Sequence, residues 1–496
     1  MKVLADDRLE GRNTGSPGHR KAAEYVAGEF EKLGLKPAGT DGFLQPVKFR
    51  ARTIDESRSR VELVRPSGTQ ALTLGTDVMI SLQVDPARAV DAGLVFAGYG
   101  LSVPEAGHDD FKGLDVKGKV VVYLSGAPPS LPGPLAAHAQ STAERAAALK
   151  KAGAIGAVRI LNPRAMDIPW GRFALSRTMT AMTLADPAMD ESAGLEIALV
   201  ADPARAEVFF EGSGRPFRKV LEAADAGQPL PRLALPARLK ATVAVTRSAV
   251  TSENVAAVFP GSDPKLRGEY VVFSAHLDHL GVGAPIKGDA IYNGAMDNAS
   301  GVAALLDVAA ILRETGVKPR RSILFLAVTG EEKGLQGSRH FANAPTVDPK
   351  SIVADINNDM FLPLFPLKSV IAFGLDESDL GRDLAAVAKE AGVAVLPDPE
   401  PKRNVFIRSD QYSFIKKGIP SLMLKVGHEK GSKEEATMHD WLTNRYHAPS
   451  DDLGQPVDEA SAGAFDALVA RLLVHVADRD DRPRWNDSSF FKRYAR

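Results

Sequence analysis

Histidine and acidic residues follow the ends of several expected strands, where their side chains could hold metal ions. The set is His276, Asp278, Asp297, Glu331, Glu332, Asp359 and His447. If these segments converge, four or more carboxylates crowd together, and like charges at short range cannot all stay ionised without cations. The residue types and their positions therefore predict a site for two divalent ions.

Each ion can be given one imidazole and one carboxylate if a further carboxylate is shared. We expect Asp297 to bridge the two ions, with His276 and Asp359 completing one side and Glu332 and His447 the other. Nitrogen and oxygen ligands without sulfur favour Zn²⁺, with Co²⁺ or Mn²⁺ as substitutes. The chain has no cysteine, so thiolate ligands are excluded.

The second glutamate and the second aspartate of the set have other expected roles. Successive side chains of an extended segment point in opposite directions, so Glu331 can face a reacting water while Glu332 binds metal. Glu331 is then the general base for hydrolysis of an amide. Asp278, two residues after His276, is expected to accept the other ring N–H and to fix the tautomer. Taken alone, Asp278 could also be an ordinary turn residue.

Strands and helices that alternate from about residue 250 onward must position these side chains. The expected strands are Tyr270–His276, Ser322–Val328, Ser351–Asn357 and Ser421–Val426, and the expected helices are Ser300–Glu314, Leu380–Ala391 and Ala460–Ala477. This alternation predicts an α/β fold with a mostly parallel, doubly wound sheet. Ligands in such a fold bind beyond the carboxyl ends of the strands, where the acidic and histidine residues lie.

The pattern of expected secondary structure changes between residues 55 and 245, which indicates a second domain. Short β-like runs alternate there with turn clusters, and a single helix is expected at Ser141–Lys151. A chain of 496 residues is also too long for one ordinary core. We expect a catalytic domain formed by residues 1–54 and 246–496, including a capped helix at 16–33, and a β-rich module at 55–245 inserted into it.

Composition excludes several function classes. The net charge is −1, from 61 basic and 62 acidic side chains, which gives no electrostatic footprint for nucleic acid. No apolar run approaches the ~20 residues of a membrane helix. There is no G-x-S-x-G nucleophile elbow, and the lack of cysteine excludes a thiol protease.

Five motifs in order resemble those of metallopeptidase family 28, the co-catalytic zinc aminopeptidases. They are HLDH at 276–279, MDNASG at 296–301, TGEE at 329–332, NNDM at 357–360 and YHAPSD at 446–451. Residues 98–124 are similar to the start of a protease-associated domain inserted in many members. The resemblance implies a zinc exopeptidase fold, the same two ligand sets and Glu331 as base. It also implies that Tyr446 donates a hydrogen bond to the tetrahedral intermediate.

The resemblance extends to a substrate pocket. The segment 408–411 matches a pocket motif that often ends in histidine, and Gln411 departs from that pattern. Hydrophobic residues after Asp359 indicate an apolar pocket beside the metals. The expected pocket residues are Met360, Phe361, Arg408, Ser409 and Asp410. The loop 427–445, rich in lysine and glutamate, is expected to overhang the site.

The leading hypothesis is an aminopeptidase that removes N-terminal residues from peptides. A carboxypeptidase or dipeptidase would use the same metal centre, with Lys402, Arg403 and Arg408 as candidates to hold a terminal carboxylate. A glutaminyl cyclase uses one zinc, and receptor-like relatives lose ligands, so the complete set argues against both. Relatives with the insert are commonly exported, which predicts an extracellular or periplasmic protein whose signal peptide has been removed. The oligomeric state is not indicated.

Overall fold

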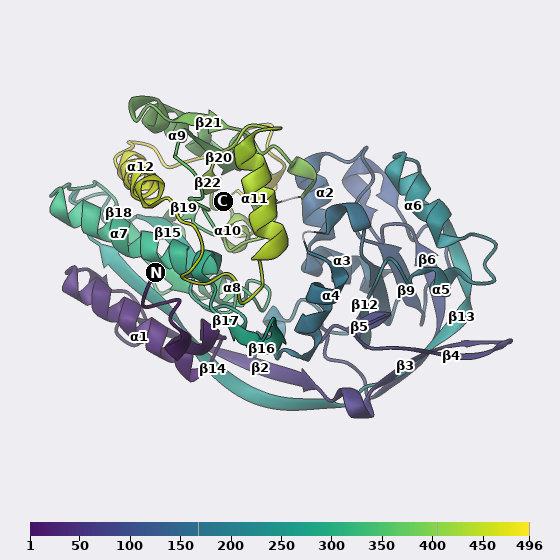
Figure 1. The fold of residues 1–496 in the computed structure, drawn as a ribbon. Coiled ribbons are helices and arrows are strands. Elements are labelled where there is room, and N and C mark those ends of the chain that lie inside the picture. Colours follow the sequence, from purple (N-terminus) through teal and green to yellow (C-terminus); the bar gives the residue numbers. More distant parts are fainter. Residues whose placement is uncertain (167, 404, 496) are drawn as a thin grey trace. The chain divides into compact units, whose positions relative to one another are not determined.

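The chain divides into two compact units, and the computed structural model describes residues 1–166, 168–403 and 405–495 of it. One unit comprises Met1–Lys48 and Val250–Arg496, and the other comprises Phe49–Ala249 (Figure 1). Strands β2 (Leu44–Ile54) and β14 (Val245–Phe259) both continue across the division. The chain therefore enters and leaves the second unit within strands, with no separate linker.

The first unit is built on a mixed sheet whose centre is parallel. Its four central strands, in spatial order, are β18 (Ser322–Val328), β15 (Tyr270–His276), β19 (Ile352–Asn357) and β22 (Ser421–Val426). Strand β14 pairs with β18 in antiparallel fashion. At the other end, β20 (Ser369–Phe373) is antiparallel to β22 and parallel to β21 (Ala394–Leu396). The expected α/β class is confirmed, whereas the sheet is mixed: antiparallel pairs flank the parallel centre, and β20 and β21 are again parallel at one edge.

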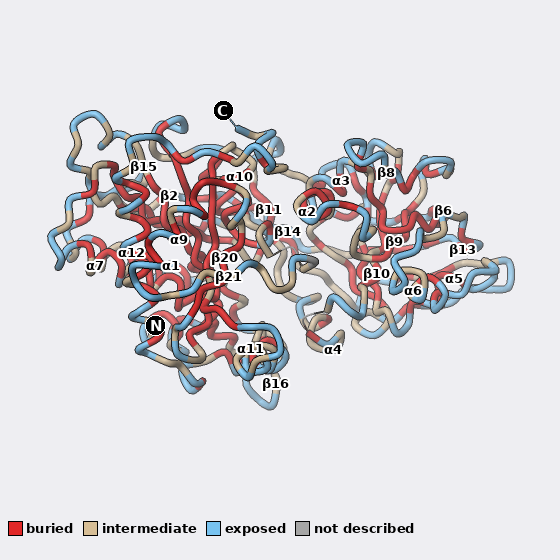
Figure 2. Tube along the Cα trace, turned by 90° about the horizontal axis from the view of Figure 1, so that it is seen from above, coloured by how far each residue is buried: buried red, intermediate tan, exposed pale blue. Residues whose placement is uncertain are grey.

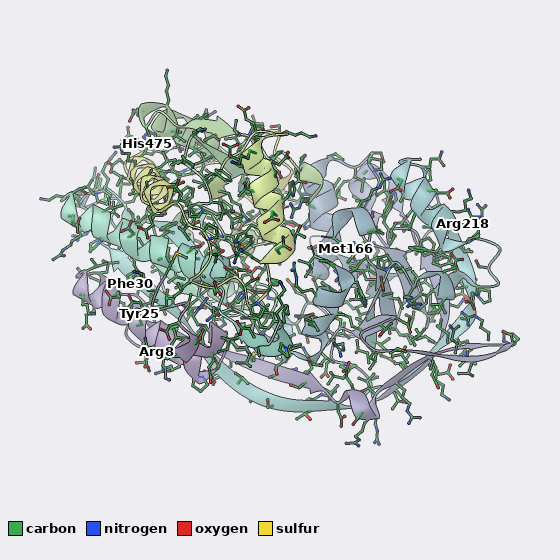
Figure 3. All side chains as sticks on the ribbon, in the orientation of Figure 1. Arg8, Tyr25, Phe30, Met166, Arg218 and His475 are labelled. Carbon is green, nitrogen blue, oxygen red and sulfur yellow. The ribbon has the colours of Figure 1, made fainter. Side chains whose placement is uncertain are left out.

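Helices cover both faces of this sheet, because alternate residues of each strand point to opposite sides. Val271 and Phe273 pack with α1 (Pro17–Lys32), α7 (Ser300–Glu314), α9 (Leu380–Glu390) and α12 (Glu459–Ala477). Val272 packs on the other side with α8 (Gln336–Asn343) and α10 (Gln411–Ile415). Buried positions (red in Figure 2) lie along these layers. Phe30 of α1 is labelled in Figure 3, and its ring centroid lies 5.9 Å from that of Phe325 in β18.

Two apolar helical segments of the first unit, Ala295–Glu314 and Glu459–Ala477, have the length and composition of a membrane span. The expected absence of any such run is therefore not confirmed. However, 72% and 56% of their apolar windows are buried inside the protein, and α7 packs against α12 in the core. Burial of this kind is typical of core helices.

The second unit contains a sheet of its own with five helices among its described residues. The strands follow the order β4 (Gly68–Leu72), β3 (Arg60–Arg65), β13 (Arg232–Thr242), β6 (Ala89–Ala97), β9 (Val120–Leu124), β10 (Gly156–Ile160), β12 (Ile197–Ala201) and β5 (Val78–Ile80). The helices are α2 (Gly133–Gln140), α3 (Thr142–Lys151), α4 (Trp170–Phe173), α5 (Glu207–Phe210) and α6 (Phe217–Asp225). The unit is more helical than expected, and its assignment as a protease-associated domain stays a prediction.

Two elements of the first unit differ from the sequence-based expectation. The segment 427–445 is not a loop throughout, because it contains the helix α11 (Lys433–Asn444). The side chain of Ser432 accepts a hydrogen bond from the backbone of Glu435, whose carboxylate accepts one from Gly431. This resembles a capping box, a signal that was readable in the sequence. A hairpin of β16 (Gly281–Ile286) and β17 (Asp289–Tyr292) also follows the HLDH motif.

Candidate metal centre

Three predicted ligands for the first ion meet at the carboxyl edge of the sheet. His276 is the last residue of β15, Asp359 lies just beyond β19, and Asp297 precedes α7. The Nε2 atom of His276 lies 3.2 Å from Oδ1 of Asp297 and 3.4 Å from Oδ1 of Asp359. These three buried residues offer one ligand atom each within a sphere suited to a single ion.

The predicted ligands for the second ion also meet at Asp297. The Nε2 atom of His447 lies 3.3 Å from Oδ2 of Asp297 and 3.4 Å from Oε2 of Glu332. Each oxygen of Asp297 thus faces a different imidazole, as a bridging carboxylate requires. The side chain of His447 is 27% exposed and that of His276 only 1%, so the second set is the more open one.

A third imidazole, which the sequence analysis left without a role, completes this side of the site. The Nδ1 atom of the fully buried His279 lies 2.8 Å from Oε1 of Glu332 and 3.8 Å from Oδ2 of Asp297. A side chain at Gly294 would overlap the His279 ring and the backbone oxygen of Asp297, so glycine is required there. His279 is the last residue of the HLDH motif, so the sequence contained a signal for it. The direction of its side chain, however, depends on the turn after β15.

The donor chemistry of these residues fits divalent metal ions. Among the described residues, Oδ1 of Asp359 and Nε2 of His279 are buried and make no hydrogen bond. Buried polar atoms are normally paired, and an unpaired one in a native site calls for a ligand or an ion. Imidazole nitrogen and carboxylate oxygen in sets of three suit zinc better than calcium or magnesium, which prefer all-oxygen surroundings.

Electrostatics around Asp297 show how tightly the charges are coupled. Burial alone would disfavour the ionised carboxylate, but His279, His276 and His447 together hold the pKa of Asp297 well below its usual range. Burial likewise opposes a charge on His447, yet Glu332 and Asp297 outweigh it and raise the pKa of that imidazole to about 10. Without cations, protonated imidazoles therefore balance the carboxylates. A bound metal ion would take over that role and release the protons.

Glu331, the predicted base, follows the end of β18, and its carboxyl interacts electrostatically with His276, Glu332 and Asp359. Burial raises the pKa of this half-buried carboxyl well above its ordinary value, and the neighbouring charges of Glu332 and Asp359 add to the effect. The backbone N–H of Glu331 donates a hydrogen bond of 3.1 Å to Oδ1 of Asp278. The two adjacent glutamates lie in a bend and turn after β18, not in an extended segment, so the expected alternation of their side chains stays a prediction.

The predicted contact of Asp278 with the His276 ring is wrong in one respect. Nδ1 of His276 lies 3.0 Å from the backbone carbonyl oxygen of Asp278, and the Asp278 carboxylate does not take part. That carboxylate accepts hydrogen bonds from Thr14 and from the backbone of Glu331. The side chain of Asp278 therefore holds the backbone of Glu331, while its main-chain carbonyl lies against the ring of His276.

The loop that carries Tyr446 and His447 is tied to the bridging residue by Asp451. The carboxylate of Asp451 accepts hydrogen bonds of 2.8 and 3.0 Å from the backbones of Met296 and Asp297. Tyr446 stacks on the imidazole of His447 with ring centroids 3.9 Å apart. Burial, with Asp297 and Glu332 nearby, raises the pKa of Tyr446 well above its normal value, so its hydroxyl keeps its proton.

The predicted pocket residues separate into different surroundings. Met360 packs in a cluster with Trp441 and Tyr446 beside the site, as expected for an apolar wall. Phe361 does not line a pocket, because it stacks on Phe465 in the core with centroids 4.6 Å apart. Phe361 directly follows Met360, and adjacent side chains can point to opposite sides. The prediction that both line the pocket did not take this into account.

The segment 408–411 is similarly divided. Ser409 accepts a hydrogen bond from Asn357, and Gln411 also contacts Asn357, so both are structural. Asp410 is fully buried, and burial raises its pKa to about 7. Arg408 is exposed. The side chain of Lys402 lies outside the described residues.

The fold and the site together define an α/β domain with two overlapping sets of metal-ligand side chains at the carboxyl edge of its sheet. Residues 254–473 match the sequence profile of peptidase family M28. This part of the chain is therefore similar to that family, in agreement with the resemblance of the five motifs.

Individual relatives agree with this assignment over parts of the chain. Leupeptin-inactivating enzyme 1 of Streptomyces exfoliatus is 33% identical over 116 residues, which are 23% of this chain and 24% of that protein. A probable zinc metalloprotease of Pyrenophora teres f. teres is 37% identical over 113 residues, 22% of this chain and 23% of that one. The matched part spans about a quarter of the length of each relative.

Solved structures extend the likeness of fold to nearly the whole chain. An aminopeptidase from Aneurinibacillus sp. strain AM-1 superposes with a TM-score of 0.56 at 20% identity, covering 98% of both chains. At this identity the match bears on the fold alone.

Proposed function

We propose that this protein is a two-metal aminopeptidase that hydrolyses the N-terminal residue from peptides, with zinc as its metal. The observation that carries the proposal is the position of Asp297, whose two oxygens face His276 and His447, with Glu331 beside them. The family assignment and the names of relatives, among them a zinc metalloprotease and an aminopeptidase, support it.

The chain's own residues supply the proton transfers of this reaction. When bound, two divalent ions would polarise the scissile carbonyl and lower the pKa of the attacking water. His276, Asp297 and Asp359 would hold one ion, and Asp297, Glu332 and His447 the other. Glu331 accepts a proton from the water while the oxygen of the water bonds to the carbonyl carbon. It then gives that proton to the leaving nitrogen as the C–N bond breaks.

Two neighbouring groups assist these steps. The hydroxyl of Tyr446, which stays protonated, donates a hydrogen bond to the oxyanion that forms on the former carbonyl oxygen. Asp278 fixes the backbone of Glu331 and thereby the direction of the base. The inserted unit, proposed as a protease-associated domain, and an extracellular or periplasmic location follow only from the family resemblance. Detection of the native protein in cell fractions tests the location.

A panel of matched substrates tests the proposal. Aminoacyl-arylamides with a free amine should be cleaved, whereas the same compounds with an acetylated amine should not. A chelator should abolish the activity, and added zinc should restore it. Release of C-terminal residues from amine-blocked dipeptides would instead establish the carboxypeptidase alternative and overturn the assignment.

A further inference from the structure

A lysine, Lys425, lies at the carboxyl edge of the sheet and interacts electrostatically with Asp359 and Asp297. Lys425 is the penultimate residue of β22, which runs parallel to β19, the strand that leads to Asp359. Among the described residues, no hydrogen bond or ion pair involves its ammonium group, and the side chain is partly exposed. Its ammonium group is therefore open to an anion from solution.

The pleat of β22 shows which side of the sheet the lysine occupies. Leu422, Leu424 and Val426 point into the core beneath α7, α9 and α12. Met423 points to the other side, where its sulfur lies 3.7 Å from Nε2 of Gln411. Because alternate residues share a face, Lys425 lies on the side of Met423, which contacts Gln411 of the segment 408–411 predicted to form the substrate pocket.

The charges around Lys425 favour an anion that arrives from solution. Burial lowers the pKa of its ammonium group. Asp359 and Asp297 attract its charge, whereas Arg403 and Arg408 repel it. The two carboxylates are assigned to metal ions in the proposed function, and their negative charge is then neutralised. Arg403 is itself paired with Glu400 at 2.9 Å, so the charge left for an incoming carboxylate is that of the half-buried Lys425.

We propose that Lys425 binds a carboxylate of the substrate and thereby selects anionic peptides. The carboxylate is either the C-terminal one of a dipeptide or tripeptide, or the acidic side chain of the residue that is removed. The inference rests on the proposed peptidase function and adds to it a substrate class and a residue that determines specificity. The three basic side chains lie near the metal ligands, so the bound carboxylate would be close to the scissile bond.

Two pairs of substrates separate the sources of the carboxylate. The first pair is leucyl-alanine and leucyl-alanine amide, which differ only at the C-terminus. The second pair is the p-nitroanilides of glutamate and glutamine, which differ only in the charge of the side chain. For each pair, the ratio of kcat/KM is measured for the native chain, for Lys425→Met and for Lys425→Arg. Any general loss of activity cancels in the ratio.

In the native chain, at least one pair should favour the carboxylate member. Lys425→Met should reduce that ratio about 10- to 100-fold, the typical worth of a hydrogen bond to a charged group. Lys425→Arg should keep most of the preference, and the exposed-lysine control Lys389→Met should leave both ratios unchanged. A change confined to the first pair assigns the terminal carboxylate, and one confined to the second pair assigns the acidic side chain.

The inference is overturned if the native chain prefers neither carboxylate, or if Lys425→Met changes neither ratio. Binding of leucyl-alanine and of its amide, measured by calorimetry on the zinc-loaded protein, gives a readout that needs no turnover. The proposed function would be refuted if the native chain cleaved none of the four substrates. The carboxylate site would still stand if the native chain bound leucyl-alanine more tightly than its amide and Lys425→Met removed that difference in binding.

Discussion

The two sides of the Asp297 site are built differently. On one side, His276 ends a central strand, is almost fully buried, and has its second ring nitrogen next to a backbone carbonyl. On the other side, His447 belongs to a loop, has a positive φ of 53° and remains 27% exposed, while the buried His279 adds a second imidazole. We infer that the strand-end side fixes its ion, and that the loop side is where ions exchange and substrate enters.

The largest predicted effect comes from the base that both sides share. Glu331→Gln should lower kcat about 100- to 10,000-fold, because it removes the proton acceptor and keeps the shape of the side chain. Zinc content should be unchanged, since Glu331 is not one of the proposed ligands. Glu390→Gln, at an exposed glutamate, is the matched control. Full activity of Glu331→Gln would remove this residue from the mechanism.

The comparison of the two sides is tested by removing one imidazole from each. His276→Ala and His447→Ala should each reduce bound zinc from about two ions per chain to about one at limiting zinc. Excess zinc should restore the second ion more readily in His447→Ala, because His279 still lies against Glu332 and Asp297. Metal titration with elemental analysis measures both. Equal behaviour of the two variants would contradict the proposed difference.

A smaller effect is expected from His279 itself. His279→Phe keeps a ring of similar shape but removes the nitrogen next to Glu332, so the affinity of the loop side for zinc should fall about 10- to 100-fold. At saturating zinc the enzyme should remain active, because His447 and Glu332 are retained. If the variant binds zinc as tightly as the native chain, His279 has only a packing role.

The smallest effect concerns a carboxyl pair remote from the ligand residues. Asp466 of α12 interacts with Asp307 of α7, and burial together with that neighbour raises the pKa of Asp466 to about 8. Its protonated form is thus favoured in the folded state. This contribution to stability is fully present below the unfolded pKa of ~3.9 and is lost as the pH rises through about 8.

Asp466→Asn should therefore be more stable than the native chain at alkaline pH and close to it at pH ~4. Thermal unfolding of both zinc-loaded proteins across this range measures the difference. A constant difference in Tm at every pH would show that Asp466 does not titrate as described.

The sequence predicted those parts of the site that depend on regular structure. Strands β15, β18 and β22 have the expected bounds, because each is an apolar run ended by polar residues. His276 and Asp359 follow directly from the ends of β15 and β19.

Features that depend on turns and on side-chain direction were missed. The approach of His279 to Glu332 is set by the turn after β15, and the contact of Phe361 with Phe465 by the direction of one side chain. Domain boundaries were displaced because β2 and β14 continue from one unit into the other, which leaves no linker composition to detect. Local composition carries little information on the geometry of turns, on the direction of single side chains or on boundaries of this kind.

The most direct test of the central claim is an anomalous difference map from crystals of the zinc-loaded protein, recorded at the zinc absorption edge. Two peaks are expected, one touching His276 and Asp359 and the other touching Glu332 and His447, with Asp297 in contact with both. A single peak, or two peaks that do not share Asp297, would contradict this expectation.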